Sequence, residues 1–155
     1  MEFSNLVNTA NAAIKSNKIQ EAIKLFADAL KLNPTSFEVC SKLGLLSFQV
    51  GDLDNSINYF KKTLLLDPKS SLAYSNLGLI YSKLNNQNLA LENYLKACEI
   101  DPKNFIVNYN LANHFFSNND DKNAEKYYQL SIELNPQHFY PYNNLFQLYD
   151  RSNNL

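Results

Sequence analysis

The chain has 155 residues, which is enough for one domain of ordinary size that folds without disulfides or bound metals. Its 14 basic and 15 acidic residues give a net charge of -1, and this balance argues against nucleic acid or an anionic membrane as a partner. With 45% hydrophobic residues and only 3 Gly and 5 Pro, the composition favours a globular protein rich in helices.

We expect neither a targeting signal nor a membrane span in this sequence. The N-terminal run Met1-Glu2-Phe3 is not a basic region followed by an apolar stretch, and no window approaches the roughly 18 consecutive apolar residues of a transmembrane helix. We therefore expect a cytoplasmic protein that does not contact a membrane. Cys40 and Cys98 lie far apart without metal-ligand spacing, so we expect both to pack as small hydrophobic residues.

An internal repeat is visible in the prolines. Four of the five recur every 34 residues, and each follows an Asn or Asp that is itself preceded by Leu or Ile: these are Pro34, Pro68, Pro102 and Pro136. Proline cannot continue a helix and disfavours helical backbone in the residue before it, so each proline marks the end of a helix. Ser36, Ser70 and Asn104 are good N-caps for the helix that follows, whereas His138 is a poorer one.

Between prolines, apolar residues recur at a spacing of three and four, which is typical of helices, and each repeat is interrupted once near its middle. The interruptions are Ser16-Asn17, Gly51-Asp52, Asn85-Asn86 and 118–120. The pattern predicts helical hairpins, with first helices over 3–15, 37–50, 71–84, 105–117 and 139–151. The second helices are expected over 19–32, 53–66, 87–100 and 121–134.

The sequence resembles the tetratricopeptide repeat family, whose pattern has an aromatic residue, Leu-Gly and Tyr in the first helix, then Ala, an aromatic residue and Pro. The third repeat matches best, with Tyr74, Leu77-Gly78, Tyr81, Ala90, Tyr94, Ala97 and Pro102 in the family's order. The resemblance covers essentially the whole chain. It implies a right-handed α-solenoid of nine helices in a single domain over 1–155, with repeats at 3–36, 37–70, 71–104 and 105–138 and a half repeat or cap helix at 139–155.

Two columns of residues at 34-residue spacing support this packing independently. Small residues that allow the two helices of a hairpin to approach closely are Ala10, Gly44, Gly78 and Ala112 on the first helix and Ala22, Ser56, Ala90 and Ala124 on the second. Aromatic residues that fill the space between neighbouring hairpins are Phe26, Phe60, Tyr94 and Tyr128. Because no hairpin can bury its apolar face alone, stability must come from stacking.

Residues for catalysis, metal binding or cofactor binding are scarce. The chain has two His and two Cys, no nucleotide-binding fingerprint and no paired-carboxylate motif. We assign no catalytic residue, no metal ligand and no cofactor. His114 and His138 have no acidic or Cys partner at ligand spacing, so we expect a surface or capping role for each.

In the family, the first helices line a concave binding surface. One column there reads Asn8, Lys42, Asn76, Asn110 and Asn144, and it is similar to the asparagine ladder of the O-linked N-acetylglucosamine transferases. An Asn amide both donates and accepts hydrogen bonds, so such a row can hold the main chain of an extended peptide. The alternative is that these amides bond solvent or the neighbouring repeat. The predicted peptide-binding groove comprises Asn8, Asn11, Asn76, Tyr109, Asn110, Asn113, Tyr140 and Asn144.

The groove is expected to be neutral, rich in amides and partly apolar. Family members that bind chaperone tails use Lys or Arg at two of its positions. Here the matching residues are Val7, Ser41 or Ser75 at the first position and Leu72, Ile106 or Tyr140 at the second. We therefore do not expect binding to the charged C-terminal tail of a chaperone.

The segment 139–155 is the most aromatic of the chain, and Phe146 stands in the column that is Gly or Ala in earlier repeats. A helix could not follow it closely in the standard way. This segment is expected to be either a cap helix or the end of a fragment of a longer protein whose next segment covers the aromatic face. In an isolated fragment, we expect a homodimer to bury this face.

The sequence thus predicts a non-catalytic scaffold that binds a protein or an extended peptide. The alternative is an accessory domain of a larger enzyme, such as a glycosyl-, sulfo- or methyltransferase, with the catalytic part outside this chain. A passive spacer is the third interpretation. The partner's identity is not encoded in a repeat architecture.

Overall fold

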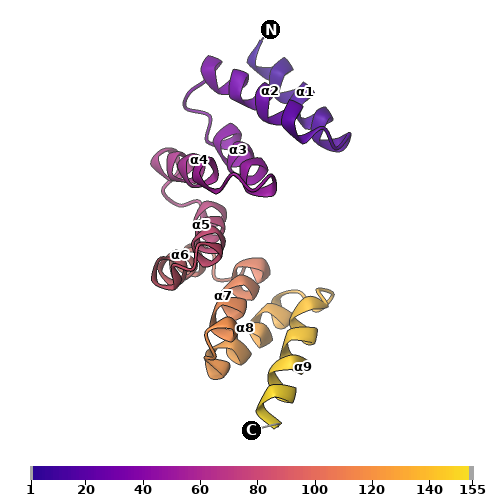
Figure 1. Cartoon of the computed structure of the whole chain (residues 1–155), viewed down its shortest axis with the longest axis vertical. Helices are drawn as coiled ribbons and strands as arrows, with labels where there is room; N and C mark the ends of the chain where they lie inside the picture. Colours follow the sequence, from indigo (N-terminus) through magenta and orange to yellow (C-terminus); the bar gives the residue numbers. More distant parts are fainter. Residues whose placement is uncertain (1, 154–155) are drawn as a thin grey trace. The chain divides into compact units, whose positions relative to one another are not determined.

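The computed structural model describes residues 2–153, and nine helices lie in this range (Figure 1). They are α1 (Phe3–Lys15), α2 (Ile19–Leu32), α3 (Phe37–Gln49), α4 (Leu53–Leu66), α5 (Ser71–Lys83), α6 (Gln87–Ile100), α7 (Phe105–Ser117), α8 (Asp121–Leu134) and α9 (Tyr140–Asn153). The helices agree with the sequence prediction to within a residue or two at each end. α3 and α5 each end one residue earlier than predicted, and α9 begins one residue later and extends two residues further.

Two compact units make up the structure, Met1–Asn76 and Leu77–Leu155, and the division falls inside α5. The prediction that residues 1–155 form a single domain stays a prediction.

Side chains before the helices fix where most of them begin. The hydroxyl of Ser36 accepts a hydrogen bond from the main-chain N–H of Val39, and that of Ser70 accepts one from Ala73, as predicted. Asn104 does the same for α7. The second helices of the hairpins also have caps, which the sequence analysis did not assign: Asp52 for α4, Asn86 for α6 and Asp120 for α8.

The turn inside each hairpin contains one residue in the left-handed region of backbone conformation. The four residues are Asn17, Gly51, Asn85 and Asn119, with φ between 57° and 83°. Only Gly adopts this conformation without strain, and Asn tolerates it better than most other residues. The interruptions in the sequence pattern therefore correspond to real turns, and they separate the helices at the predicted places.

In the first unit, the core lies between the hairpin of α1 and α2 and the helix α3 that follows it. The ring of Phe26 is buried there with Ala10, Ala13, Val39 and Leu43. Within the next hairpin, a Cβ atom added to Gly44 would lie 2.9 Å from Cζ of Phe60, so the helices can approach this closely only because residue 44 is Gly. Ser56 is fully buried and donates a hydrogen bond to the carbonyl oxygen of Gly44.

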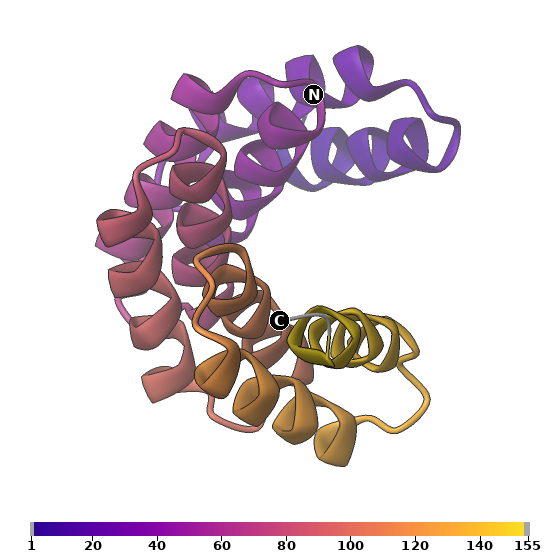
Figure 2. The same cartoon turned by 60° about the horizontal axis from the view of Figure 1, so that its bottom comes forward.

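The second unit repeats this packing. A Cβ atom on Gly78 would lie 2.7 Å from the ring of Tyr94. Tyr94 in turn packs with Ala90 and with Leu111 of α7. The pairing of α7 with α8, and α9 beside this pair, can be followed in Figure 2, and here Tyr128 is buried with Ala112, Ala124 and Leu148. Both predicted packing columns are therefore confirmed as core.

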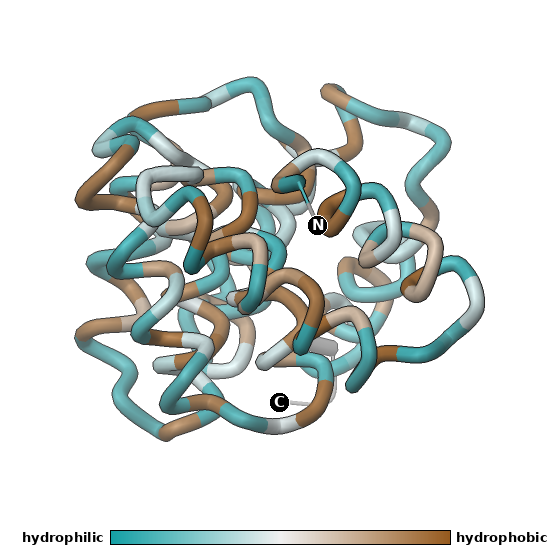
Figure 3. The backbone as a smooth tube through the Cα atoms, turned by 90° about the horizontal axis from the view of Figure 1, so that it is seen from above, coloured by the Kyte–Doolittle hydropathy of each residue, from teal (hydrophilic) through white to brown (hydrophobic). Residues whose placement is uncertain are grey.

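Hydrophobic and hydrophilic residues alternate along the helices, as Figure 3 shows. Within the described residues, no helix is long and apolar enough to cross a membrane.

Candidate functional site

The eight residues predicted to bind a peptide come from four helices. Asn8 and Asn11 lie on α1, Asn76 on α5, Tyr109, Asn110 and Asn113 on α7, and Tyr140 and Asn144 on α9. The structure brings four of them into one contact network, which we call the α7–α9 face: Tyr109, Asn113, Tyr140 and Asn144.

Local helix geometry places each pair on one side of its helix. Tyr109 and Asn113 are four residues apart on α7, as are Tyr140 and Asn144 on α9, and this spacing puts both members of a pair on the same face. α7 and α9 then bring the two pairs together. Nδ2 of Asn144 donates hydrogen bonds to Oδ1 of Asn113 at 2.8 Å and to the hydroxyl of Tyr109 at 3.3 Å.

A buried tyrosine of α8 supports this network from below. The hydroxyl of Tyr128 donates a hydrogen bond to Oδ1 of Asn113 at 2.7 Å and lies 3.2 Å from Nδ2 of Asn144. Burial is the main cause that raises the pKa of Tyr128 to about 12. The phenol therefore keeps its proton near neutral pH and serves as a donor to Asn113.

These hydrogen bonds fix the orientation of the side-chain amides of Asn113 and Asn144, and they use only one polar atom of each amide. Oδ1 of Asn113 accepts two hydrogen bonds, while its Nδ2 group has no partner among the residues that the structure describes. Conversely, Asn144 uses Nδ2 and keeps Oδ1 unpaired within that range. Neither atom is a buried orphan, so both are open to solvent or to a ligand. The face thus presents one donor and one acceptor.

Aromatic rings lie beside these amides. The rings of Tyr109 and Tyr140 have centroids 6.4 Å apart, and both contact the ring of His138 edge to face at 5.4 Å. Phe105 contacts the same imidazole from another side. Tyr140 is 51% exposed, so its ring forms part of an open surface.

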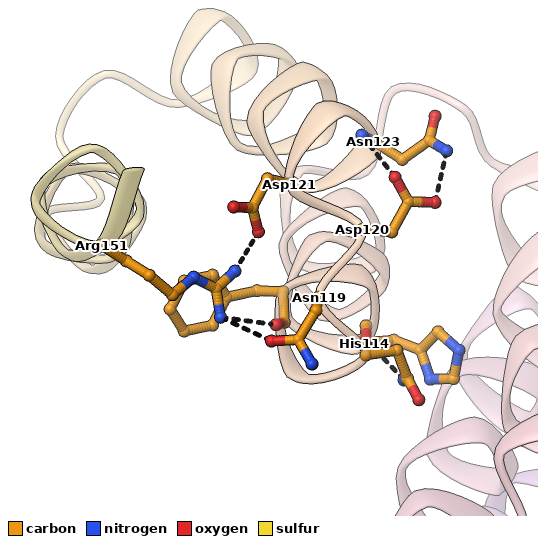
Figure 4. Close-up of polar contacts among 8 residues, drawn as sticks. His114, Asn119, Asp120, Asp121, Asn123 and Arg151 are labelled. Atoms are coloured by element: carbon orange, nitrogen blue, oxygen red, sulfur yellow. Dashed lines mark hydrogen bonds and ion pairs between the residues drawn. The ribbon is translucent and has the colours of Figure 1, made fainter. Parts of the chain in front are cut away.

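A separate set of contacts fastens the last turns of α9 (Figure 4). The guanidinium of Arg151 forms an ion pair with Asp121 and donates a hydrogen bond to Oδ1 of Asn119 at 3.0 Å. It also lies over the ring of Phe116, 4.3 Å from the ring centroid. Tyr149 adds a hydrogen bond to Glu125 of α8. These contacts hold α9 in the position that brings Asn144 to Asn113.

The other four predicted residues are arranged differently. Asn76 donates its amide hydrogen to the carbonyl oxygen of Leu72 in its own helix. Asn8 is exposed, while Asn11 and Asn110 are half-buried. The continuous ladder at 34-residue spacing therefore stays a prediction.

His114 corrects one expectation. A surface or capping role was predicted, but only 6% of the residue is exposed, and its Nδ1 atom is buried without a hydrogen-bond partner among the described residues. Its ring instead packs against the rings of Tyr94 and Phe115, and such aromatic neighbours make an imidazole a good core residue. His138 is half-buried in the aromatic contacts around Tyr109 and Tyr140, and its Nδ1 atom also has no hydrogen-bond partner among the described residues. The predicted capping role of His138 stays a prediction.

The cysteines are free, as expected, and only Cys40 is fully buried. Cys98 is half-buried, and burial raises the pKa of its thiol to about 11, so the reactive thiolate is scarce near neutral pH. Within the described residues, no group of three or more His, Cys, Asp or Glu side chains could hold a metal ion.

The hydrogen bonds of Tyr128 were not predicted from the sequence. That residue was assigned only to the packing column, where repeats one and two have Phe26 and Phe60. Two features of the last full repeat could have indicated these hydrogen bonds. Tyr128 has a hydroxyl group, and position 113 has Asn where the two preceding repeats have Leu45 and Leu79. A buried hydroxyl needs a hydrogen-bond partner, and the amide supplies it.

Family models of the tetratricopeptide repeat match the chain at residues 4–36, 37–70, 71–104 and 106–138. The chain belongs to the tetratricopeptide repeat family. Members of this family are typically non-catalytic, and the repeat builds scaffolds for protein interaction. Comparison with curated protein sequences found no match.

Solved structures with the same fold include several of the protein MamA. One of them has a TM-score of 0.81 at 21% sequence identity and is aligned over 96% of this chain and 81% of its own. Another, MamA from residue 41 to the end from Desulfovibrio magneticus RS-1, has a TM-score of 0.78 at 21% identity, over 88% of this chain and 77% of its own. These similarities establish an all-α solenoid of helix-turn-helix repeats.

Proposed function

We propose that the chain is a non-catalytic binding scaffold and that the α7–α9 face holds an extended, uncharged segment of a partner protein. The observation that carries this proposal is the amide pair of Asn113 and Asn144. Their shared hydrogen bond and the phenol of Tyr128 orient both amides, and one donor and one acceptor of the pair have no partner among the described residues. A peptide main chain offers the complementary carbonyl and N–H at every residue except proline.

Preorganisation makes this small set of groups useful. Each main-chain hydrogen bond contributes about 0.5–1.5 kcal/mol net, so two of them alone give weak binding. Because the amides are already fixed, little side-chain ordering is needed on binding. The exposed ring of Tyr140, and exposed Ile106 two turns before Asn113 on α7, add contact area for side chains of the partner.

An array of uncharged peptides, followed by titration of the intact chain with the best one, tests this function. Asn113→Asp is the sharpest variant, since its carboxylate still accepts from Tyr128 and Asn144 but has no N–H to donate. We expect about fivefold weaker binding. Asn5→Asp, at an exposed position of α1 outside the face, is the matched control for the added charge. Equal loss in both variants, or no saturable peptide on the array, would contradict the proposal.

A second candidate function is homodimerisation through 139–155, of which residues 154 and 155 lie outside the described part. Phe146 supports it, since its side chain is 72% exposed and stands in the column where earlier repeats have Gly or Ala. In those repeats the aromatic ring of the second helix occupies the space above the small residue. A Phe at this position would block such packing.

Sedimentation equilibrium of the whole chain tests the dimer. We expect a dimer that dissociates on Phe146→Ser, while Tyr142→Ser, which changes another exposed ring of α9, has a smaller effect. A monomer at high concentration would rule the dimer out. The remaining predicted groove residues, Asn8, Asn11, Asn76 and Asn110, stay predictions, as does the cytoplasmic location.

A further inference from the structure

We propose that the segment held by the α7–α9 face is proline-rich and binds in the polyproline II conformation. This inference rests on the proposed function and names the partner's chemistry. Three features of the face support it: two tyrosine rings beside one another, an amide donor of Asn113 without a partner among the described residues, and four defining side chains that carry no charge.

The rings form a surface on which a proline can lie. Tyr109 and Tyr140 have centroids 6.4 Å apart with their planes at 36°, and Phe139 continues the surface with a centroid 4.2 Å from that of Tyr140. Tyr140 and Phe139 are both more than half exposed. Aromatic-lined surfaces of this kind recognise proline-rich segments, whose rings pack flat against them.

The amides supply the polar half of the recognition. In polyproline II the main chain has no internal hydrogen bonds, so every carbonyl oxygen is available as an acceptor. Nδ2 of Asn113 is the unpaired donor beside Tyr109, and both residues lie on one face of α7. Oδ1 of Asn144 can then accept from the N–H of a residue next to the prolines, which requires that this residue is not itself proline.

Conformational entropy decides between a proline-rich segment and a flexible one. Ordering a flexible peptide costs conformational entropy at every residue that becomes fixed. Two hydrogen bonds to the amides of Asn113 and Asn144 offset only part of this cost. A proline-rich segment is already close to its bound conformation, so the same contacts give measurable affinity.

Titration of the intact, isotope-labelled chain with a capped oligoproline peptide that carries one alanine next to its prolines tests the inference, monitored by amide chemical shifts. The comparison ligand is a capped peptide of equal length with alternating Ala and Thr. We expect the oligoproline to bind about tenfold more tightly or better, with the largest shifts in α7 and α9. Tyr140→Leu should weaken oligoproline binding about fivefold, whereas Tyr142→Leu should leave it nearly unchanged.

Each outcome distinguishes the two proposals. Equal binding of both peptides would overturn the preference for proline and leave the scaffold proposal standing. Binding of only the Ala and Thr peptide would do the same. If neither peptide binds at millimolar concentration, this inference is wrong, and the peptide array described above decides the scaffold proposal separately. Unchanged oligoproline affinity in Tyr140→Leu would also overturn the inference, because the ring would then play no part.

Discussion

Nδ2 of Asn144 donates a hydrogen bond to Oδ1 of Asn113 over 2.8 Å, and these two residues are 31 positions apart. Equivalent residues of successive repeats are 34 positions apart. Asn144 therefore bonds a residue of the preceding repeat that belongs to a different column from its own. That column has Leu45 and Leu79 in repeats two and three, and Asn11 of repeat one is 31 positions before Lys42 rather than an Asn, so this amide pair is particular to the last interface.

Asn144→Ala is expected to destabilise the second unit. The substitution removes the donor to Asn113 and Tyr109, while Tyr128 keeps its own hydrogen bond to Asn113. We expect a loss of about 1–2 kcal/mol in the free energy of unfolding. Denaturant titration would measure it. Asn143→Ala, which changes an exposed neighbour, is the control, and an equal loss there would show that the network adds nothing.

Gly78→Ala should destabilise the chain more than Gly44→Ala. A methyl group at 78 would lie 2.7–2.9 Å from atoms that include Cγ of Tyr94, at the base of a buried ring. At 44, the nearest atoms are at the far end of the Phe60 ring, which can move more easily. Overpacking costs about 1–3 kcal/mol, against a gain of about 1 kcal/mol in helix propensity.

Thermal unfolding of the two glycine variants would measure this difference. Gly51→Ala provides a contrast, because nothing lies within 4 Å of the added carbon and any cost there comes from φ of +83° alone. A Gly78→Ala protein as stable as the wild type would contradict the close helix packing.

Arg151→Ala is expected to loosen the last turns of α9. It removes the ion pair with Asp121, the hydrogen bond to Asn119 and the contact with the Phe116 ring. Because about a third of each charged side chain is exposed, we expect the free energy of unfolding to fall by only about 1 kcal/mol. In the Arg151→Ala protein, the amide hydrogens of α9 should exchange faster than in the wild type, while those of α1 should exchange at the wild-type rate. Arg151→Lys should be nearly as harmful, since Lys cannot form the same planar contacts.

Stability should fall in acid because of His114. Burial lowers the pKa of its imidazole in the folded chain, below the value of about 6.5 expected when unfolded. Between these two pKa values the unfolded state binds more protons, so the free energy of unfolding decreases as the pH falls below about 6.5. The loss is complete once the pH is below the folded pKa.

Denaturant titrations from neutral to acidic pH would test this, with His114→Phe as the variant. Phe keeps an aromatic ring against Tyr94 and cannot be protonated, so its stability should depend less on pH in this window. An identical pH dependence in both proteins would assign the acid sensitivity to other groups.

The helices were predictable because the signals for them are local. Proline after each hairpin, Asn or Gly in the left-handed turns and Ser or Asn at the caps act through their own backbone or the next turn. Gly44 and Gly78 were predictable for a related reason. Their spacing repeats, and a repeat fold places equivalent residues in equivalent contacts.

The candidate site was only partly predictable. Tyr109, Asn113, Tyr140 and Asn144 were all predicted, but as members of a row facing a ligand. That Asn144 bonds Asn113, and that Tyr128 joins them, depends on how far α9 is shifted along α7. His114 was misjudged because its burial depends on Tyr94 of another helix.

The sequence by itself determined the repeat, its helices and its packing columns, because 34-residue periodicity records which residues must be buried together. Only the tertiary structure decided which polar groups of the last repeats satisfy one another and which stay open. The physical reason is that hydrophobic burial tolerates small displacements, whereas hydrogen bonds depend on distance and direction within a few tenths of an ångström. Periodicity specifies the first kind of contact and does not resolve the second.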